Sequence, residues 1–290
     1  MLDLSHIPSQ QQLTTTFYVT SGSTWQTWNK PRNAKMIEIF CLGGGAGGST
    51  PILGPGIAGG GVGGGAGGIV RGIIPAFLLP DTIYILVGKG GAGTFNVGNT
   101  GGGNGGISYI GLQPSTSEQT LICKSSTIVA SGTTAATVSV VSLSAFGNSG
   151  LFTAIAGIGG GAGGTNTPTQ GGSQAALGIS LVTSGGGGGG KNASAFAAGG
   201  NITSASAILT TQVNGGITDA QNGADGYGTL IPFCGTGGGG GAGKLGTGTG
   251  GNGGNGFYGC GGGGAGGSSS ATGLRGGTGG DGLVIITVIT

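Results

Sequence analysis

The chain has 290 residues, of which 80 are glycine, and only 6% of its residues are charged. A collagen is excluded, because glycine runs such as residues 185–190 break a Gly-X-Y register and there are only nine prolines. The formal net charge of +2, with lysine and arginine scattered singly, excludes a highly charged disordered chain and a basic nucleic-acid-binding protein.

The first segment of the chain is polar and precedes the first predicted strand. Residues 1–12, MLDLSHIPSQQQ, lack the basic and apolar regions of a secretory signal. We expect these residues to form an attachment arm and the protein to be made without export. The four cysteines are far apart in the sequence, so free thiols are expected.

Several segments have the composition of β-strands. Residues 14–19 and 23–28 suggest a hairpin that turns at Ser21-Gly22. Three apolar segments each adjoin a glycine run and are expected to share one sheet, namely Met36–Leu42, 82–87 and Leu283–Ile289. A slip in the alternation of residues 137–146 predicts a strand with a β-bulge. No segment has the periodicity of a convincing helix.

The glycine residues form separate runs between residues 43 and 282, with spacers of unequal length. Because apolar strands flank these runs, we expect them to lie inside a fold rather than to act as flexible linkers. Polyglycine suits an extended helix with three residues per turn, whose peptide groups point outward and bond to neighbouring copies. Larger residues within runs, such as Val62, Asn104, Ile158 and Cys260, are expected to face outward.

The sequence therefore predicts an all-β and irregular fold: a β-sandwich-like module and a bundle of polyglycine II helices connected by loops. The chain is expected to divide into the arm of residues 1–12 and a single glycine-rich domain over residues 13–290. The β-module is expected to comprise residues 13–42, 69–87, 107–156 and 283–290, with the polyglycine runs between residues 43 and 282.

No motif indicates an enzyme. The glycine runs that end at Lys191 and Lys244 lack the Ser or Thr of a phosphate-binding loop. A calcium-roll nonapeptide at residues 276–284 occurs once, whereas such sites work in tandem. Asp219 and Asp225 could be a sugar-cleaving pair, but solvated loop carboxylates are the simpler interpretation. We expect no catalytic activity, no cofactor and no metal.

An ordered set of sequence features resembles a known family. Residues 24–31, TWQTWNKP, are followed by Met36–Leu42 running into three glycines. Leu79-Pro80 precedes the strand exit VGKGGAG at residues 87–93, and the chain ends in GGDGLVII at residues 279–286. This set resembles the glycine-rich domains of bacteriophage tail-fibre and tail-associated proteins over about residues 14–290. It is more loosely similar to the distal tail-fibre adhesins of T-even-type phages, which fold a bundle of polyglycine helices.

The resemblance implies a virion protein, made in the host cytoplasm, that acts as a tail-fibre or surface adhesin-like component in host attachment. Its implied partners are other virion or tail proteins and a host envelope glycan or outer-membrane protein, with no nucleic acid. A homotrimer is one assembly that the resemblance allows. Two alternatives stay open: a purely structural virion protein, such as a head fibre, collar or adaptor, and a secreted glycine-rich protein.

Recognition is expected to rest on aromatic residues in the spacers, because the glycine runs carry almost no side chains. The candidate receptor-binding residues are Phe95, Asn96, Phe196, Tyr227, Phe233, Phe257 and Tyr258. Phe257 and Tyr258 have the strongest case, because two adjacent rings between glycine runs are not expected to face one core. The alternative is that these rings cover the ends of the bundle or join the β core.

Overall fold

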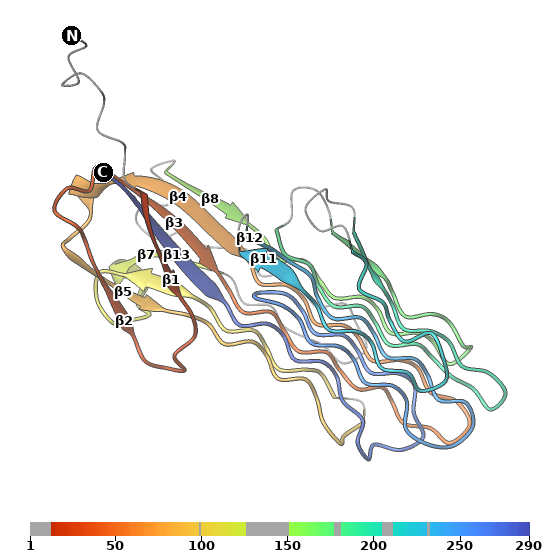
Figure 1. Cartoon of the computed structure of the whole chain (residues 1–290). Coiled ribbons are helices and arrows are strands. Elements are labelled where there is room, and N and C mark those ends of the chain that lie inside the picture. Colours follow the sequence, from red (N-terminus) through yellow and green to blue (C-terminus); the bar gives the residue numbers. More distant parts are fainter. Residues whose placement is uncertain (1–12, 99, 126–150, 177–180, 205–210, 231–232) are drawn as a thin grey trace, which may run out of the picture.

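The computed structural model describes residues 13–98, 100–125, 151–176, 181–204, 211–230 and 233–290. These residues form a β-module at one end and a long bundle of extended segments at the other (Figure 1). The helical turns within them are the short 3-10 turns η2 (Ala76–Leu78) and η3 (Glu118–Thr120), so the fold is all-β and irregular, as predicted. The expected arm at residues 1–12 and the bulged strand at 137–146 lie outside the described residues. Within the described ranges, no helix is long and apolar enough to cross a bilayer.

Two antiparallel sheets make up the β-module. The first has the strand order β1-β13-β3-β4-β8, from Leu13–Tyr18, Leu283–Ile289, Met36–Leu42, Ile69–Pro75 and Phe152–Ile155. The second has the order β2-β5-β6-β7, from Gln26–Asn29, Thr82–Leu86, Tyr109–Gly111 and Leu121–Lys124.

Alternating side chains of the two sheets meet in one apolar core. Ile37 and Ile39 of β3 lie in this core together with Ile83 and Ile85 of β5 and Trp28 of β2. Successive side chains of a strand point to opposite faces, so this alternation sets which face of each sheet is buried. The prediction of a β-sandwich-like module is confirmed.

Two predicted strand pairings are wrong. The segments expected to form a hairpin belong to different sheets, because β1 pairs with β13 and β2 pairs with β5. Gly22 has a positive φ of 76°, so a turn does occur there, but it carries the chain from one sheet to the other. β13 pairs with β3 as expected, whereas β5 lies in the facing sheet.

The bundle is held by backbone hydrogen bonds with a period of three residues. In the run 59–68, the amides of residues 60, 63 and 66 donate to carbonyls of residues 164, 161 and 158. The amides of residues 61, 64 and 67 donate to residues 265, 262 and 259, while the carbonyls of residues 62, 65 and 68 accept from the run 43–49. A period of three with several neighbouring runs is the pattern of polyglycine II, and the prediction of ordered glycine runs is confirmed.

Glycine is needed in these runs because the backbones approach so closely. A Cβ on Gly64 would lie 2.0 Å from the carbonyl oxygen of Ala46, and one on Gly63 would lie 2.1 Å from that of Gly185. The expectation that larger residues face outward holds for Asn104, which is exposed, but is wrong for Val62 and Cys260, which are buried. Cys260 belongs to a second apolar cluster, where the bundle meets the five-stranded sheet.

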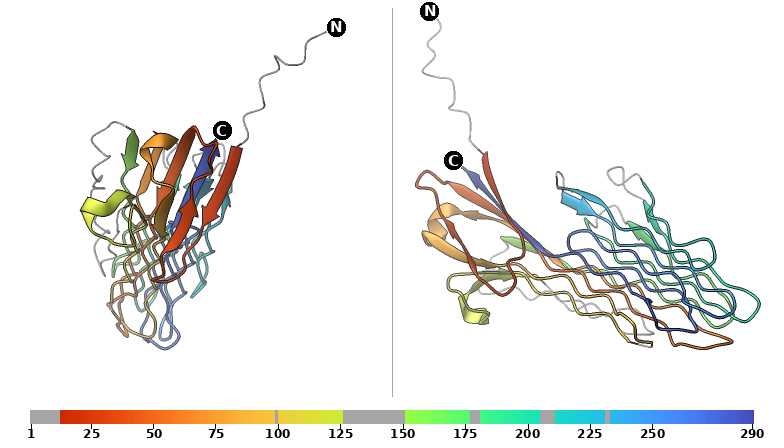
Figure 2. Two further views of the ribbon diagram at one scale, coloured as in Figure 1. Left: turned by 90° about the vertical axis from the view of Figure 1, so that its left-hand side faces the viewer. Right: turned by 60° about the horizontal axis from the view of Figure 1, so that its bottom comes forward.

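The runs leave the β-module, turn at the far end and return (Figure 1 and Figure 2). The far-end loops comprise residues 51–58, 95–98, 165–169, 192–196, 217–221, 245–249 and 268–274. Two short sheets lie among the runs, formed by β9 (Gln174–Ala176) with β10 (Ile202–Ser204) and by β11 (Gly228–Leu230) with β12 (Phe233–Gly235). Leu13 of β1 is paired with Ile289 of β13. Both strands that begin and end the described chain therefore lie at the end opposite the loops.

Candidate functional site

The structure separates the predicted binding residues into two groups. Phe95, Asn96 and Phe196 lie in far-end loops. Tyr227, Phe233, Phe257 and Tyr258 lie at the other end of the runs, near the β-module. A single contact surface therefore does not contain all of these residues.

Phe257 and Tyr258 both pack against the same apolar cluster. Their rings are half-buried beside Leu42, Cys260 and other residues of the cluster where bundle and sheet meet. The two ring centroids are 5.1 Å apart in an edge-to-face arrangement, a favoured geometry for aromatic pairs. The expectation that two adjacent rings could not face one core is wrong, because a cluster between sheet and bundle accommodates both.

Tyr227 and Phe196 also make contacts within the fold. The Tyr227 hydroxyl donates to the carbonyl of Thr211 over 2.5 Å and accepts from its amide over 2.9 Å, and the half-buried ring packs on Cys234. Phe196 is half-buried and forms an antiparallel bridge with Lys191 across its loop. Phe233 is the first residue of β12. These contacts connect neighbouring segments of the chain.

Phe95 differs from the other predicted aromatic residues because its side chain is 48% exposed. The guanidinium carbon of Arg275 lies 4.1 Å from the centroid of its ring, a cation–π contact. The following residue, Asn96, has a positive φ of 55°, and its Oδ1 accepts a 2.6 Å hydrogen bond from the amide of Gly273. The loop at 95–98 is thus fixed against the loop at 268–274.

Phe95 and Arg275 line a groove of about 520 Å³ on the flank of the bundle. Asn222 Oδ1 accepts from the amide of Asn252 over 2.8 Å, and Asn252 Oδ1 accepts from the amide of Arg275 over 2.7 Å. At the surface of a polyglycine bundle, some backbone amides have no neighbouring run whose carbonyl could accept their hydrogen bond. Here the asparagine side-chain oxygens accept these bonds instead. We call Asn222, Asn252 and Arg275 the upper row.

A second row of the same kind lies three residues further along each run. Asp225 Oδ1 accepts from the amide of Asn255 over 2.6 Å. Asn255 Oδ1 accepts from the amide and the hydroxyl of Thr278, both over 2.9 Å. Side chains three residues apart lie on one face of a helix with three residues per turn. We call Asp225, Asn255 and Thr278 the lower row.

The groove continues toward the β-module through a second depression of about 430 Å³. Thr278 lines both depressions, and the second also contains Lys89 and Asp281. Asp281 Oδ1 accepts a 2.7 Å hydrogen bond from the amide of Gly90. We call the two depressions together the flank groove. The sequence interpretation missed it, although the spacing of three was visible in Asn252 and Asn255 and in Arg275, Thr278 and Asp281.

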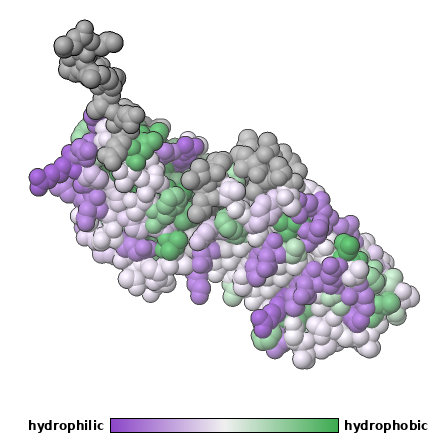
Figure 3. Space-filling model, in the orientation of Figure 1, coloured by the Kyte–Doolittle hydropathy of each residue, from purple (hydrophilic) through white to green (hydrophobic). Residues whose placement is uncertain are grey.

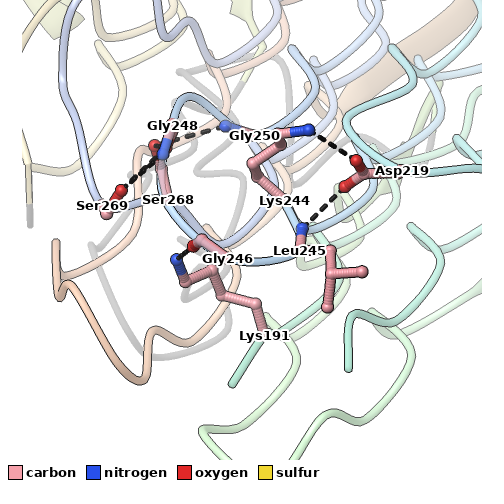
Figure 4. Close-up of polar contacts among 9 residues, drawn as sticks. All are labelled: Lys191, Asp219, Lys244, Leu245, Gly246, Gly248, Gly250, Ser268 and Ser269. Atoms are coloured by element: carbon pink, nitrogen blue, oxygen red, sulfur yellow. Dashed lines mark hydrogen bonds and ion pairs between the residues drawn. The ribbon is translucent and has the colours of Figure 1, made fainter. Parts of the chain in front are cut away.

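The far-end loops contain a separate polar cluster, shown in Figure 4. Lys244 Nζ lies 2.5 Å from Asp219 Oδ2, and the amide of Leu245 donates to Asp219 Oδ1 over 2.6 Å. The buried Lys191 donates to the carbonyl of Gly246, and burial lowers the pKa of its ammonium group while the Asp219 carboxylate acts in the opposite direction. These contacts hold the loop at 245–249 in place.

The candidate catalytic and metal-binding residues do not converge. Asp219 contacts Lys244 in the far-end loops, whereas Asp225 lies in the flank groove. Asp281, from the calcium-roll motif, binds a backbone amide. In the described part of the chain, no three His, Cys, Asp or Glu side chains are grouped to hold a metal ion.

The outer face of the five-stranded sheet carries exposed apolar side chains on either side of the ion pair between Glu38 and Arg71. Leu13 is 64% exposed, and Phe17, Ile73 and Ile155 are also exposed. Their strand positions place them on the face opposite the core. Figure 3 shows hydrophobic side chains over part of this sheet, with hydrophilic patches both on the β-module and on the bundle. Large exposed apolar patches are typical of interaction surfaces.

Comparison with known proteins gives one family. A family model described as a glycine-rich domain matches residues 19–288. This range includes both sheets except for strand β1 and the last residue of β13, together with all runs of the bundle. No curated protein matches the sequence.

Proposed function

Because the chain belongs to the glycine-rich domain family, we propose that it is a bacteriophage virion protein in which a polyglycine bundle serves host attachment. In this proposal it is a tail-fibre or surface adhesin-like component, and it has no catalytic role. The proposal is supported by the sequence features it shares with the glycine-rich domains of phage tail-fibre proteins. It is supported further by the arrangement of the two ends of the molecule.

The observation that carries the proposal is that the two ends of the molecule differ. β1 and β13 are paired at one end, so both ends of the described chain lie at the β-module. The far-end loops lie at the opposite end of an ordered bundle. A bundle fixed by backbone hydrogen bonds would hold these loops and its flank away from the particle without an ordering cost on binding.

Each end is suited to one of the proposed partners. The exposed apolar face that includes Leu13 and Phe17 suits another virion or tail protein, since stable assemblies bury apolar surface. The flank of the bundle presents polar side chains beside the exposed ring of Phe95, and this surface suits a host envelope glycan or an outer-membrane protein. Assembly as a homotrimer is part of the proposal and is measured by light scattering of the purified protein.

A purely structural virion role is the second candidate. It is favoured by the contacts of Tyr227, Phe257 and Tyr258, whose rings pack within the fold. It is also favoured by the far-end cluster, where Lys191 and Lys244 bind groups of the protein itself. A head fibre, collar or adaptor would need this rigidity and no receptor.

Labelling of intact particles with a gold-conjugated antibody against the purified protein tests the virion location. Competition tests attachment: host cells are incubated with the purified protein before the phage is added, and free phage is counted. The attachment role predicts label on the particle and reduced adsorption. Label on the particle with unchanged adsorption would favour the structural role, and the absence of label would refute both.

A further inference from the structure

We infer that the flank groove is a binding site for a linear, uncharged glycan. The inference deepens the proposed function, on which it rests for the host envelope as the source of the glycan. It is carried by the shape of the groove, its hydrogen-bonding groups, its charge balance and its one exposed ring.

The shape of the groove suits an extended polymer. Its two depressions, of about 520 and 430 Å³, adjoin at Thr278 and follow the direction of the runs. The upper and lower rows are separated by one turn of three residues, which corresponds to about 9 Å. This repeat is close to the length of a disaccharide in an extended glycan chain. A linear glycan could therefore meet equivalent groups in successive rows.

The rows offer both donors and acceptors to hydroxyl groups. The Oδ1 atoms of Asn222, Asn252 and Asn255 are occupied by backbone amides. No hydrogen bond from their Nδ2 groups occurs within the described residues, so these groups remain as donors. Asp225 uses Oδ1 for an amide and keeps Oδ2 as an acceptor. A sugar hydroxyl can donate and accept at once, and so matches such a mixed surface.

The charges in the groove favour a neutral ligand. Arg275 and Lys89 are balanced by Asp225 and Asp281, so the formal charges cancel. A phosphate-rich or uronic-acid polymer would approach two carboxylates as well as two cations. Nucleic acid would need a predominantly basic surface instead.

Phe95 provides an apolar platform at the far end of the groove. One part of its ring contacts the Arg275 guanidinium, yet the side chain remains 48% exposed. The apolar C–H face of a sugar ring packs on such a surface, and exposed aromatic rings with fixed neighbours are common binding anchors. The hydrogen bond from Gly273 to Asn96 holds the adjacent backbone in place before a ligand arrives.

The test uses purified protein and a panel of immobilised bacterial polysaccharides, with neutral O-polysaccharides beside acidic capsular ones. Phe95→Ala removes the platform. Ala224→Trp obstructs the groove through an exposed residue that lines it, and its backbone hydrogen bonds do not involve the side chain. Phe77→Ala is the matched control, because Phe77 is 83% exposed on η2 of the β-module. Melting temperatures establish that each variant is folded.

We expect binding to neutral polysaccharide, weakened about tenfold by Phe95→Ala and at least as much by Ala224→Trp. The control should bind like the unmodified protein. Equal binding by folded Ala224→Trp would overturn the inference, as would binding to acidic polysaccharides alone. The purified protein could also bind no polysaccharide while the antibody labels the particles and the protein competes with phage adsorption. That result would rule out the glycan site and leave the proposed function intact.

Discussion

Replacing Gly64 by Ala tests whether the bundle depends on close backbone approach. The new Cβ would lie 2.0 Å from the Ala46 carbonyl oxygen, about 1.4 Å short of ordinary van der Waals contact. Because the obstacle is backbone, the run at 43–50 must move. The displacement of Gly64 and of this run from each other disturbs three hydrogen bonds at the clash: Gly64 to Gly262 (2.7 Å), Ala46 to Gly65 (2.9 Å) and Gly262 to Ala46 (3.0 Å).

The size of the effect follows from these bonds. Each lost bond costs about 1 kcal/mol, and more where a buried group is left unpaired, so the total is roughly 3–6 kcal/mol. This is a large part of the roughly 5–15 kcal/mol that stabilises a typical domain. At about 2 °C per kcal/mol for a chain of this size, the melting temperature should fall by roughly 6–12 °C.

Gly56→Ala is the matched control. Gly56 lies in a far-end loop, and a Cβ there would meet nothing within 4 Å. The same chemical change should therefore be neutral or stabilise the protein by up to about 1 kcal/mol, because alanine lowers the entropy of the unfolded chain. Calorimetry measures the whole molecule, and the fluorescence of Trp25, which contacts Tyr109, and of the buried Trp28 reports the β-module. Equal melting temperatures for the two variants would refute the close-packed bundle.

Two further predictions concern the thiols and the last strand. Burial raises the pKa of the Cys260 thiol to about 12, and contact with Cys41 raises that of Cys123. The folded protein keeps these protons when the unfolded chain begins to lose them near pH 8.5. The free energy of unfolding should therefore fall as pH rises from about 8.5 toward 12, and Cys260→Ala should flatten this slope in urea titrations; an unchanged slope would contradict the assignment. Deleting Leu283–Thr290, which contains β13, should give insoluble protein, because β13 lies between β1 and β3 and its loss exposes two strand edges. A truncated chain that stays soluble and melts cooperatively would show that β13 is dispensable.

The positions of the strands and glycine runs were more predictable from the sequence than the pairing of the strands within the sheets. Met36–Leu42 and Leu283–Ile289 are strands with the expected bounds, and the glycine runs are ordered as inferred. The pairing of β5 could not be predicted, because a β-branched pattern indicates burial without naming the neighbouring strand. Ser21-Gly22 likewise indicated a turn, but turn chemistry does not show whether the next strand joins the same sheet.

The binding residues were harder to predict, since exposure depends on tertiary packing. The sequence predicts that two adjacent aromatic residues between glycine runs do not share a core, yet Phe257 and Tyr258 adjoin a cluster that forms only when bundle and sheet meet. Phe95 is the predicted ring that remains well exposed beside a groove. The Asn, Asp and Thr side chains of the flank groove are spaced three residues apart, and this spacing can be recognised in the sequence. Their alignment across runs could not be predicted, because it follows from hydrogen bonds between distant segments.

The bonding of the run at 59–68 has a consequence for biosynthesis. This run is paired with residues 158–164 and 259–265, which the ribosome makes long after it. Contacts so distant in sequence form slowly, because the chain loses the entropy of closing a large loop before it gains the stabilising contacts. The bundle is therefore expected to assemble after translation rather than hairpin by hairpin. Until then the emerging glycine runs expose little apolar surface, which lowers the tendency of the unfinished chain to aggregate.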